Sequence, residues 1–235
     1  ITLLVQYDAQ GMWTGTGKFG VTFKWNYLKL HPSGDAKIEW GDGTTTESVR
    51  SAYVNGEIYH LYGKKVKKGG NLADDGIHKR TIKIYGSGLS VFQAPEVDGA
   101  HWGHRPGGVM DFTITGMGHL NQFKMAGTQI EYFDLRNFDS SNLTDCSYMF
   151  SNCWRLGGGY GIGSTTRPTS YIGNLKVRGS FAYAFRKAGF YGKPFKVVGL
   201  DTLDVSECTD LSYTFDEAYN IHTHNSSDSK ITGAN

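Results

Sequence analysis

Long hydrophobic runs, a basic leader and an excess of charge of either sign are all absent from this sequence of 235 residues. No apolar stretch approaches the roughly 18 residues of a membrane span, so no membrane insertion is expected. The formal net charge of +2 provides no strong field, so nucleic acid is not an expected partner. Residues 1–5 are apolar but lack a basic region and a cleavage site, so they are not a signal peptide. The chain does not begin with Met, and we expect it to start inside a longer or processed product.

Cysteine is scarce, and the three residues present form an odd set that argues against a disulfide framework. Cys146 and Cys153 lie two turns apart in the helix expected there, roughly 10 Å along its axis and too far for a bridge. We expect these two residues and Cys208 to be small apolar core residues, and metal or redox chemistry is the alternative.

Catalytic and metal-binding motifs are also missing. The sequence contains no GxSxG, HExxH or Walker-type phosphate loop, and the glycine-rich residues 157–163 open no helix that could bind a dinucleotide. His101 and His104 flank Trp102, but no further ligand stands at a recognised spacing, so packing of Trp102 is favoured over a metal. A glycan hydrolase would need two carboxylates across one cleft, and no isolated pair can be nominated. We therefore expect no enzyme, no cofactor and no metal ion.

Glycine is abundant at 32 residues and aromatic residues make up 14% of the chain, a composition typical of many turns between short strands. Apolar and polar residues alternate through residues 1–87, which predicts an all-β region. Asp42-Gly43 predicts a tight turn because both residues tolerate positive φ. The strand residues on which this prediction depends are Leu3, Val5, Tyr7, Val21, Phe23, Trp25, Ile38, Trp40, Ile82 and Ile84.

Three segments of this region form a recognisable set: IEWGDGT at 38–44, YHLY at 59–62 and TIKI at 81–84. They resemble the WGDGT turn, the H-x-Y element and the final strand of the polycystic-kidney-disease (PKD) family. The resemblance implies an immunoglobulin-like β-sandwich over residues 1–87. Residues 63–78 are longer than the short turn of that family and are rich in lysine. We expect them to form a solvated hairpin tip, and contact with phosphate or a glycan is the alternative.

A repeat begins near residue 110 and is clearest at residues 133–156. There a strand-like start leads through a polar turn into an expected helix at 143–153, whose apolar residues recur at i, i+3, i+4 and i+7. One such stripe cannot be buried alone, so neighbouring copies are required. The copies align on Phe123, Phe150, Phe185 and Phe215, and strand-like segments precede them at 112–114, 133–135, 175–177 and 203–205.

Aspartate also recurs in the copies, which favours turn and cap roles over acid–base catalysis. The aspartates concerned are Asp134, Asp139, Asp145, Asp204 and Asp210.

Residues 133–156, FDLRNFDSSNLTDCSYMFSNCWRL, agree along almost their whole length with the repeat LDLSNFDTSNVTDMSYMFSGCSSL. That repeat is typical of BspA-type leucine-rich-repeat proteins, so the resemblance implies an irregular leucine-rich-repeat solenoid at 110–225. A junction at 88–109 precedes it and a polar tail at 226–235 follows. The predicted fold is mainly β with short helices: a PKD-like sandwich followed by BspA-like repeats.

The candidate binding residues are aromatic. Tyr148, Tyr183 and Tyr213 stand two residues before the aligned phenylalanines, and Trp154 and Tyr219 stand four residues after them. Stacking between copies is one interpretation, and a row of exposed rings that contacts a sugar or a protein is the other. Solenoids present extended surfaces of this kind.

The two resemblances imply a non-enzymatic, exposed adhesion or structural protein. Such repeats occur in bacterial surface proteins and in structural proteins of bacteriophages. The missing signal peptide and cell-wall anchor favour a virion component: a tail, fibre or head-decoration protein. A fragment of a bacterial cell-surface adhesin, which would be extracellular, and a purely structural particle-stabilising subunit are the alternatives. The expected partners are neighbouring virion or surface subunits and a host-surface glycan or protein, with the chain forming a homo-oligomer within its assembly.

Overall fold

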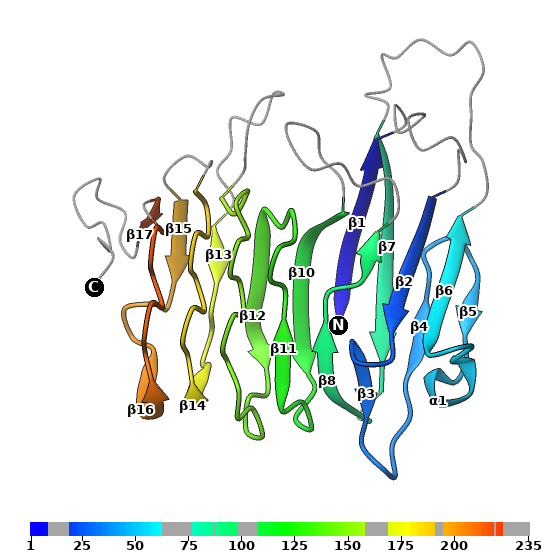
Figure 1. Ribbon diagram of the computed structural model, residues 1–235, viewed down its shortest axis with the longest axis horizontal. Helices are drawn as coiled ribbons and strands as arrows, with labels where there is room; N and C mark the ends of the chain where they lie inside the picture. Colours follow the sequence, from blue (N-terminus) through cyan, green and yellow to red (C-terminus); the bar gives the residue numbers. More distant parts are fainter. Residues whose placement is uncertain are drawn as a thin grey trace.

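The computed structural model describes residues 1–8, 19–62, 77–86, 88–97, 108–157, 169–190, 195–218 and 220–222. The chain is mainly β, as its sequence predicts, and its strands stand side by side in an elongated molecule (Figure 1). The strands are β1 (Thr2–Asp8), β2 (Phe19–Lys24), β3 (Leu28–Leu30), β4 (Lys37–Glu39), β5 (Thr45–Thr46), β6 (Glu57–Tyr62), β7 (Ile77–Tyr85), β8 (Leu89–Gln93), β9 (Glu96–Val97), β10 (Gly108–Gly116), β11 (Gln122–Lys124), β12 (Tyr132–Phe138), β13 (Ser170–Tyr171), β14 (Lys176–Ser180), β15 (Phe195–Val198), β16 (Asp204–Asp210) and β17 (Ile221–His222). Within the described ranges one helix forms, α1 (Val49–Ala52), and no helix there is long and apolar enough to cross a membrane.

The largest sheet has nine strands in the order β17-β15-β13-β12-β10-β1-β7-β4-β5. Its pairs from β5 to β10 are antiparallel, whereas its pairs from β10 to β17 are parallel. The apolar positions of the alternating sequence pattern are the buried ones: Leu3 and Val5 in β1 and Ile82 in β7 are fully buried. The sheet passes without a break from the first 87 residues into the repeat region, and β10 is the strand at which its pairing changes.

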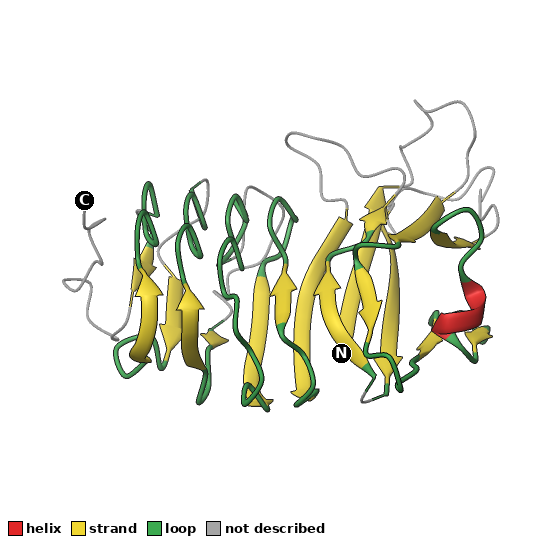
Figure 2. Cartoon of the chain, turned by 60° about the horizontal axis from the view of Figure 1, so that its bottom comes forward, coloured by secondary structure: helices red, strands yellow, loops and turns green. Residues whose placement is uncertain are grey.

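A second layer of strands lies against this sheet (Figure 2). Strands β3, β8 and β11 form one group and β14 and β16 form another, and bridges on either side of Asp145 connect the two groups. The rings of Phe92 in β8 and Phe112 in β10 stack at 5.8 Å between centroids, so the two layers meet through their apolar faces. One hydrophobic core runs from Ile1 to Ile221. Strands β6, β2 and β9 form a separate sheet.

The predicted tight turn at Asp42-Gly43 connects β4 to β5. Asp42 Oδ1 accepts hydrogen bonds from the Thr44 N–H (3.0 Å) and hydroxyl (2.6 Å), and Oδ2 lies 2.8 Å from His60 Nε2. The His60 ring stacks on Trp40 at 4.6 Å, so His60 connects the turn to strand β6. Partial burial alone would raise the pKa of the Asp42 carboxyl, but the hydrogen bonds from Thr44 and His60 outweigh it and lower the pKa to about 2.

This carboxylate makes stability depend on pH. Because its folded pKa is depressed, its contribution is fully present above about pH 4 and is lost as the pH falls towards 2. After allowance for its partial exposure, we expect the Asp42 carboxylate to contribute about 1–2 kcal/mol to the free energy of unfolding at neutral pH. The measurement compares the free energy of unfolding of the wild type and Asp42→Asn from neutral to acid pH. The difference should shrink towards zero in acid, and a difference that stays constant would contradict the assignment.

The helix expected at 143–153 is absent, and this prediction is wrong. Residues 147–152 form consecutive turns, one of which is closed by a hydrogen bond from the Ser151 N–H to Tyr148 O at 3.3 Å. Tyr148 and Asn152 have φ of +57° and +56°, which an α-helix excludes. The surrounding Ser, Thr, Asp and Asn residues have low helix propensity because they bond locally to the backbone.

The apolar period that suggested a helix nevertheless marks the core. The aligned phenylalanines form one continuous row of ring contacts. The Phe150 ring meets Phe123 edge-on at 6.0 Å and lies 5.3 Å from Phe185, and Phe185 stacks on Phe215 at 5.6 Å. The fully buried residues of the expected helix face are Cys146, Met149, Phe150 and Cys153.

The four strand-like segments of the repeat fall into two different layers. Segments 112–114 and 133–135 belong to β10 and β12 in the nine-stranded sheet, whereas 175–177 and 203–205 fall mainly on β14 and β16 in the second layer. Each of the two later copies therefore contains two strands, one in each layer. In the large sheet the short strand β13 pairs with β12, and β15 pairs with β13.

Candidate binding surface

Three turn segments stand side by side along the array: the first turn row (146–152), the second (180–187) and the third (210–217). Loops of successive copies are neighbours in Figure 2. The N–H groups of residues 146, 148, 150 and 152 donate to the carbonyls of 180, 182, 184 and 186 at 2.7–3.0 Å. Those of 181, 183, 185 and 187 donate to 210, 212, 214 and 216 at 2.8–3.0 Å. Every inter-row N–H group therefore points towards the following copy.

Each row contains a pair of residues with positive φ, four positions apart. The first residue of each pair is a tyrosine, with φ of +57° at Tyr148, +59° at Tyr183 and +55° at Tyr213. Such a conformation is uncommon for an aromatic residue, and the hydrogen bonds between rows hold it in place. The repetition brings the three side chains to the same position on successive copies.

These three residues form the tyrosine ladder. The rings of Tyr148 and Tyr183 are 4.9 Å apart and nearly parallel (10°), and those of Tyr183 and Tyr213 are 5.2 Å apart (8°). Tyr148 and Tyr213 are 42% and 57% exposed. The rings therefore stack between copies, as one interpretation of the sequence expects, and Tyr148 and Tyr213 also remain partly exposed to solvent. Contact with a sugar or a protein stays a prediction.

The ladder presents edges rather than faces. Tyr183 is covered on both faces by its neighbours, and Lys124 Nζ lies 5.6 Å from the centroid of the Tyr148 ring. Within the described ranges none of the three phenol hydroxyls meets a hydrogen-bond partner. A line of free hydroxyls can donate to and accept from a polar ligand, whereas stacking of a sugar on the inner ring faces is blocked.

Cationic groups beside the ladder were not anticipated. The Arg186 guanidinium lies 5.6 Å from the Tyr183 ring centroid, and Lys124 also lies 3.7 Å from Asp145. A signal existed in the sequence, since Lys124 and Arg186 both directly follow an aligned phenylalanine. Each cation is already paired with an aspartate, Lys124 with Asp145 and Arg186 with Asp216 at 3.0 Å, so only their remaining N–H donors are open to a polar ligand.

The other nominated aromatic residues are not part of this stack. Trp154 is half-buried in the turn that follows the first row. Tyr219 lies outside the described residues. So do the lysine-rich insert up to residue 76, the His101–His104 cluster, most of the glycine-rich segment and the tail, and those interpretations stay predictions.

The recurring aspartates have the turn role that the sequence predicts. An oxygen of each accepts the N–H of the residue two positions on, at 2.8–3.0 Å. Hydrogen bonds from Ser212 lower the pKa of Asp210 in this way. The cysteine prediction is confirmed for Cys146 and Cys153, which are free, fully buried thiols, and burial raises the pKa of both to about 12. Cys208 is free and half-buried.

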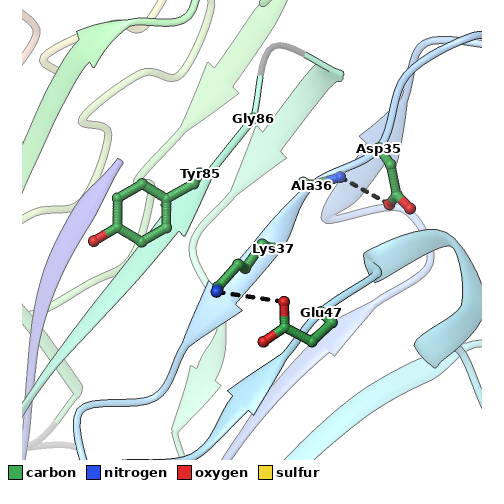
Figure 3. A pocket seen from close by; sticks show the side chains of 6 residues that line it. All are labelled: Asp35, Ala36, Lys37, Glu47, Tyr85 and Gly86. Carbon is green, nitrogen blue, oxygen red and sulfur yellow. Dashed lines mark hydrogen bonds and ion pairs between the residues drawn. The ribbon is translucent and has the colours of Figure 1, made fainter.

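A shallow hollow near β4 is lined by charged and polar side chains that already have partners within the chain (Figure 3). Lys37 and Glu47 pair with each other at 3.3 Å, and Asp35 accepts hydrogen bonds from the N–H groups of Ala36 and Arg50. Its other lining residues include Tyr85, whose hydroxyl donates to Glu39. Across the described part of the chain, no three His, Cys, Asp or Glu side chains are grouped to hold a metal ion.

The tyrosine ladder is therefore the best candidate site. Comparison of the chain with protein-family models, with curated proteins and with solved structures finds no match.

Proposed function

We propose that this chain is a non-enzymatic, exposed adhesion or structural protein, and specifically a bacteriophage virion component such as a tail, fibre or head-decoration protein. The observation that carries the proposal is the tyrosine ladder, a line of exposed phenol edges held on a parallel, hydrogen-bonded scaffold. In this proposal residues 110–225 are a BspA-like leucine-rich-repeat solenoid that offers the contact surface. Residues 1–87 are a PKD-like sandwich that acts as a spacer or attachment base.

The ladder would bind a host-surface glycan or protein through its hydroxyl row. Each hydroxyl can exchange a water for a polar group of the ligand, and the neighbouring Lys124 and Arg186 add charge-assisted contacts. Two further identities share this architecture. One is a fragment of a bacterial cell-surface adhesin, and the other is a structural subunit whose ladder packs against a neighbouring subunit.

Replacement of hydroxyls without loss of the rings tests this proposal. The full chain and the double variant Tyr148→Phe/Tyr183→Phe are compared on a glycan array and on whole bacterial cells. The variant keeps the stack, so its melting temperature should be unchanged. Binding should fall about tenfold or more, because two hydrogen bonds of about 0.5–1.5 kcal/mol are lost.

Tyr85→Phe is the matched control, since Tyr85 is also an exposed tyrosine but lies on β7, far along the sheet from the ladder. It should bind like the wild type. Equal binding by all three proteins, or no binding by the wild type, would remove the ligand-binding role and favour the particle-stabilising subunit.

A further inference from the structure

The tyrosine ladder fixes the interval at which a ligand can meet its hydroxyls. The rings of Tyr148, Tyr183 and Tyr213 follow one another at 4.9 and 5.2 Å and are parallel to within 10°. Main-chain hydrogen bonds between the rows hold this interval, such as the one from the Tyr148 N–H to Ala182 O at 3.0 Å. Since the three tyrosines share one backbone conformation, with φ of +55° to +59°, their hydroxyls repeat at nearly the interval of the rings.

A second line of polar side chains runs beside the ladder. It consists of Asn152, Lys187 and Glu217, which occupy the other position of positive φ in the three turn rows. The N–H groups of Asn152 and Lys187 take part in the bonds between rows, so the second line has the same interval as the ladder. Lys187 Nζ and Glu217 Oε1 pair at 3.2 Å. The ladder is therefore bordered by hydrogen-bond donors and acceptors.

Peptide ligands fit this surface poorly. Side chains on one face of a β-strand repeat at about 6.4–6.8 Å, and those of a polyproline II helix repeat at about 9 Å, so both fall out of step with the rings. An α-helix advances about 5.4 Å per turn, and strands of a second sheet are about 4.7–4.9 Å apart. Both would keep step, but both dock through apolar side chains, whereas the line beside the ladder is polar.

A linear glycan matches both the interval and the chemistry. A pyranose residue with two equatorial linkages spans about 5 Å between its linkage oxygens, given covalent bonds of about 1.5 Å. Such a chain is extended, and every residue carries hydroxyls that donate and accept. It can therefore place one residue on each turn row, with one hydroxyl at a tyrosine and another at the second line. An axial linkage bends the chain away from this course.

The covered ring faces settle the direction in which the glycan would lie. Tyr183 has a tyrosine ring on each side, and Lys124 Nζ lies 5.6 Å from the centroid of the Tyr148 ring. A sugar that stacked on an aromatic face would have to enter between these groups. The phenol edges remain accessible, so a glycan chain would run along them in the direction of the array.

We propose that the tyrosine ladder binds an extended, equatorially linked glycan chain lengthwise, with one pyranose residue on each turn row. This inference rests on the proposed ligand-binding role of the ladder and adds the class of ligand, its direction and its register. Because the ladder is rigid, each residue that comes into step adds hydrogen bonds at little cost in protein conformational entropy. Affinity should therefore rise about two- to tenfold with each of the second and third residues.

The test is a calorimetric titration of the full chain with β-1,4-linked oligomers of glucose and of N-acetylglucosamine, from one to three residues long. In at least one series the trisaccharide should bind about four- to a hundredfold more tightly than the monosaccharide. Maltotriose is the matched control ligand, because it differs from cellotriose only in its axial linkage. It should bind no more tightly than glucose.

Variants of the chain locate the contact. Tyr183→Phe keeps the middle ring of the ladder, so its melting temperature should be unchanged. Its affinity for the trisaccharide should fall about two- to tenfold, while its affinity for the monosaccharide stays nearly the same. Tyr85→Phe, on β7, should bind both sugars like the wild type.

The possible failures separate this inference from the proposed function. Equal affinity for the monosaccharide and the trisaccharide, or for cellotriose and maltotriose, would overturn the lengthwise register and leave the ladder as a binding surface. If no sugar binds but Tyr148→Phe/Tyr183→Phe abolishes binding to bacterial cells, the ligand is a protein and the glycan inference is wrong. If neither sugars nor cells bind, the proposed function fails as well. A mass that rises with protein concentration and falls in the same double variant would show a second copy on the ladder and would overturn the inference.

Discussion

Replacement of Phe150 by Ala should lower the free energy of unfolding by about 3–5 kcal/mol. Phe150 is fully buried within the row of phenylalanines, stacked on the Phe133 ring at 4.2 Å and with the Phe185 ring at 5.3 Å. The close rows on both sides are held by main-chain hydrogen bonds, so they cannot collapse into the cavity. A denaturant titration monitored by circular dichroism measures the loss.

Tyr148→Ala is the comparison for this variant. Tyr148 lies two residues away on the exposed side of the same row and is stacked on one neighbour, so its loss should cost about 1 kcal/mol. Equal losses at the two positions would show that the tyrosine ladder is part of the core and would weaken its assignment as a binding surface.

Gly173→Ala should destabilise the chain by about 2–5 kcal/mol. Gly173 has φ of +66°, and a Cβ atom there would lie 2.6 Å from the main-chain oxygen of Leu135 and 2.7 Å from the Cα of Arg136. The left-handed conformation costs about 1–2 kcal/mol for alanine, and displacement of packed backbone adds about 1–3 kcal/mol. Calorimetric measurement of thermal unfolding gives the total loss of stability.

Gly127→Ala separates the two contributions. Gly127 has a similar φ of +73°, but no atom lies within 4 Å of the place of its Cβ. The Gly127→Ala variant should lose only the stability that the left-handed conformation costs an alanine, about 1–2 kcal/mol. If Gly127→Ala is as destabilising as Gly173→Ala, the close approach between copies at Gly173 contributes nothing.

The sequence predicts the chain's local features well. The alternation at Leu3 and Val5, the turn at Asp42-Gly43 and the burial of Phe150 all depend on neighbours within a few residues. The turn role of the recurring aspartates is equally local, because each carboxylate bonds to the N–H two residues on. Such patterns can be read without knowing what lies beside the segment.

The failures concern contacts between copies. An apolar period of i, i+3, i+4 and i+7 fits an α-helix and also fits the consecutive turns observed at Tyr148 and Asn152. Hydrogen bonds to the following copy decide between them, and a single segment contains no information about those bonds. Because a single segment contains no information about its neighbours, the sequence alignment also gives segments 133–135 and 175–177 equivalent positions, although they lie in different layers.

The three tyrosines of the candidate site were predictable from the sequence, whereas its geometry and the neighbouring Lys124 and Arg186 were not. Alignment on the phenylalanines brings Tyr148, Tyr183 and Tyr213 to one position, and the structure stacks all three. That the inner faces are covered follows from the spacing of the rows, which no sequence pattern expresses. The change from basic residues at 169–190 to acidic residues at 199–218 was visible in the sequence, but the ion pairs that it forms, such as Arg186–Asp216, depend on the two copies being neighbours.

The N–H groups of the turn rows all point in one direction, so the copies share one pattern of main-chain hydrogen bonds. In the turn rows each interior copy offers acceptors to the copy before it and donors to the copy after it, so a duplicated copy inserted between two others would repeat the same row-to-row bonds on both sides. Charge adds one restriction, because a basic copy followed by an acidic one must be duplicated together to keep every ion pair. The length of such a protein can therefore change by gene duplication in steps of two copies, while the region of residues 1–87 stays as it is.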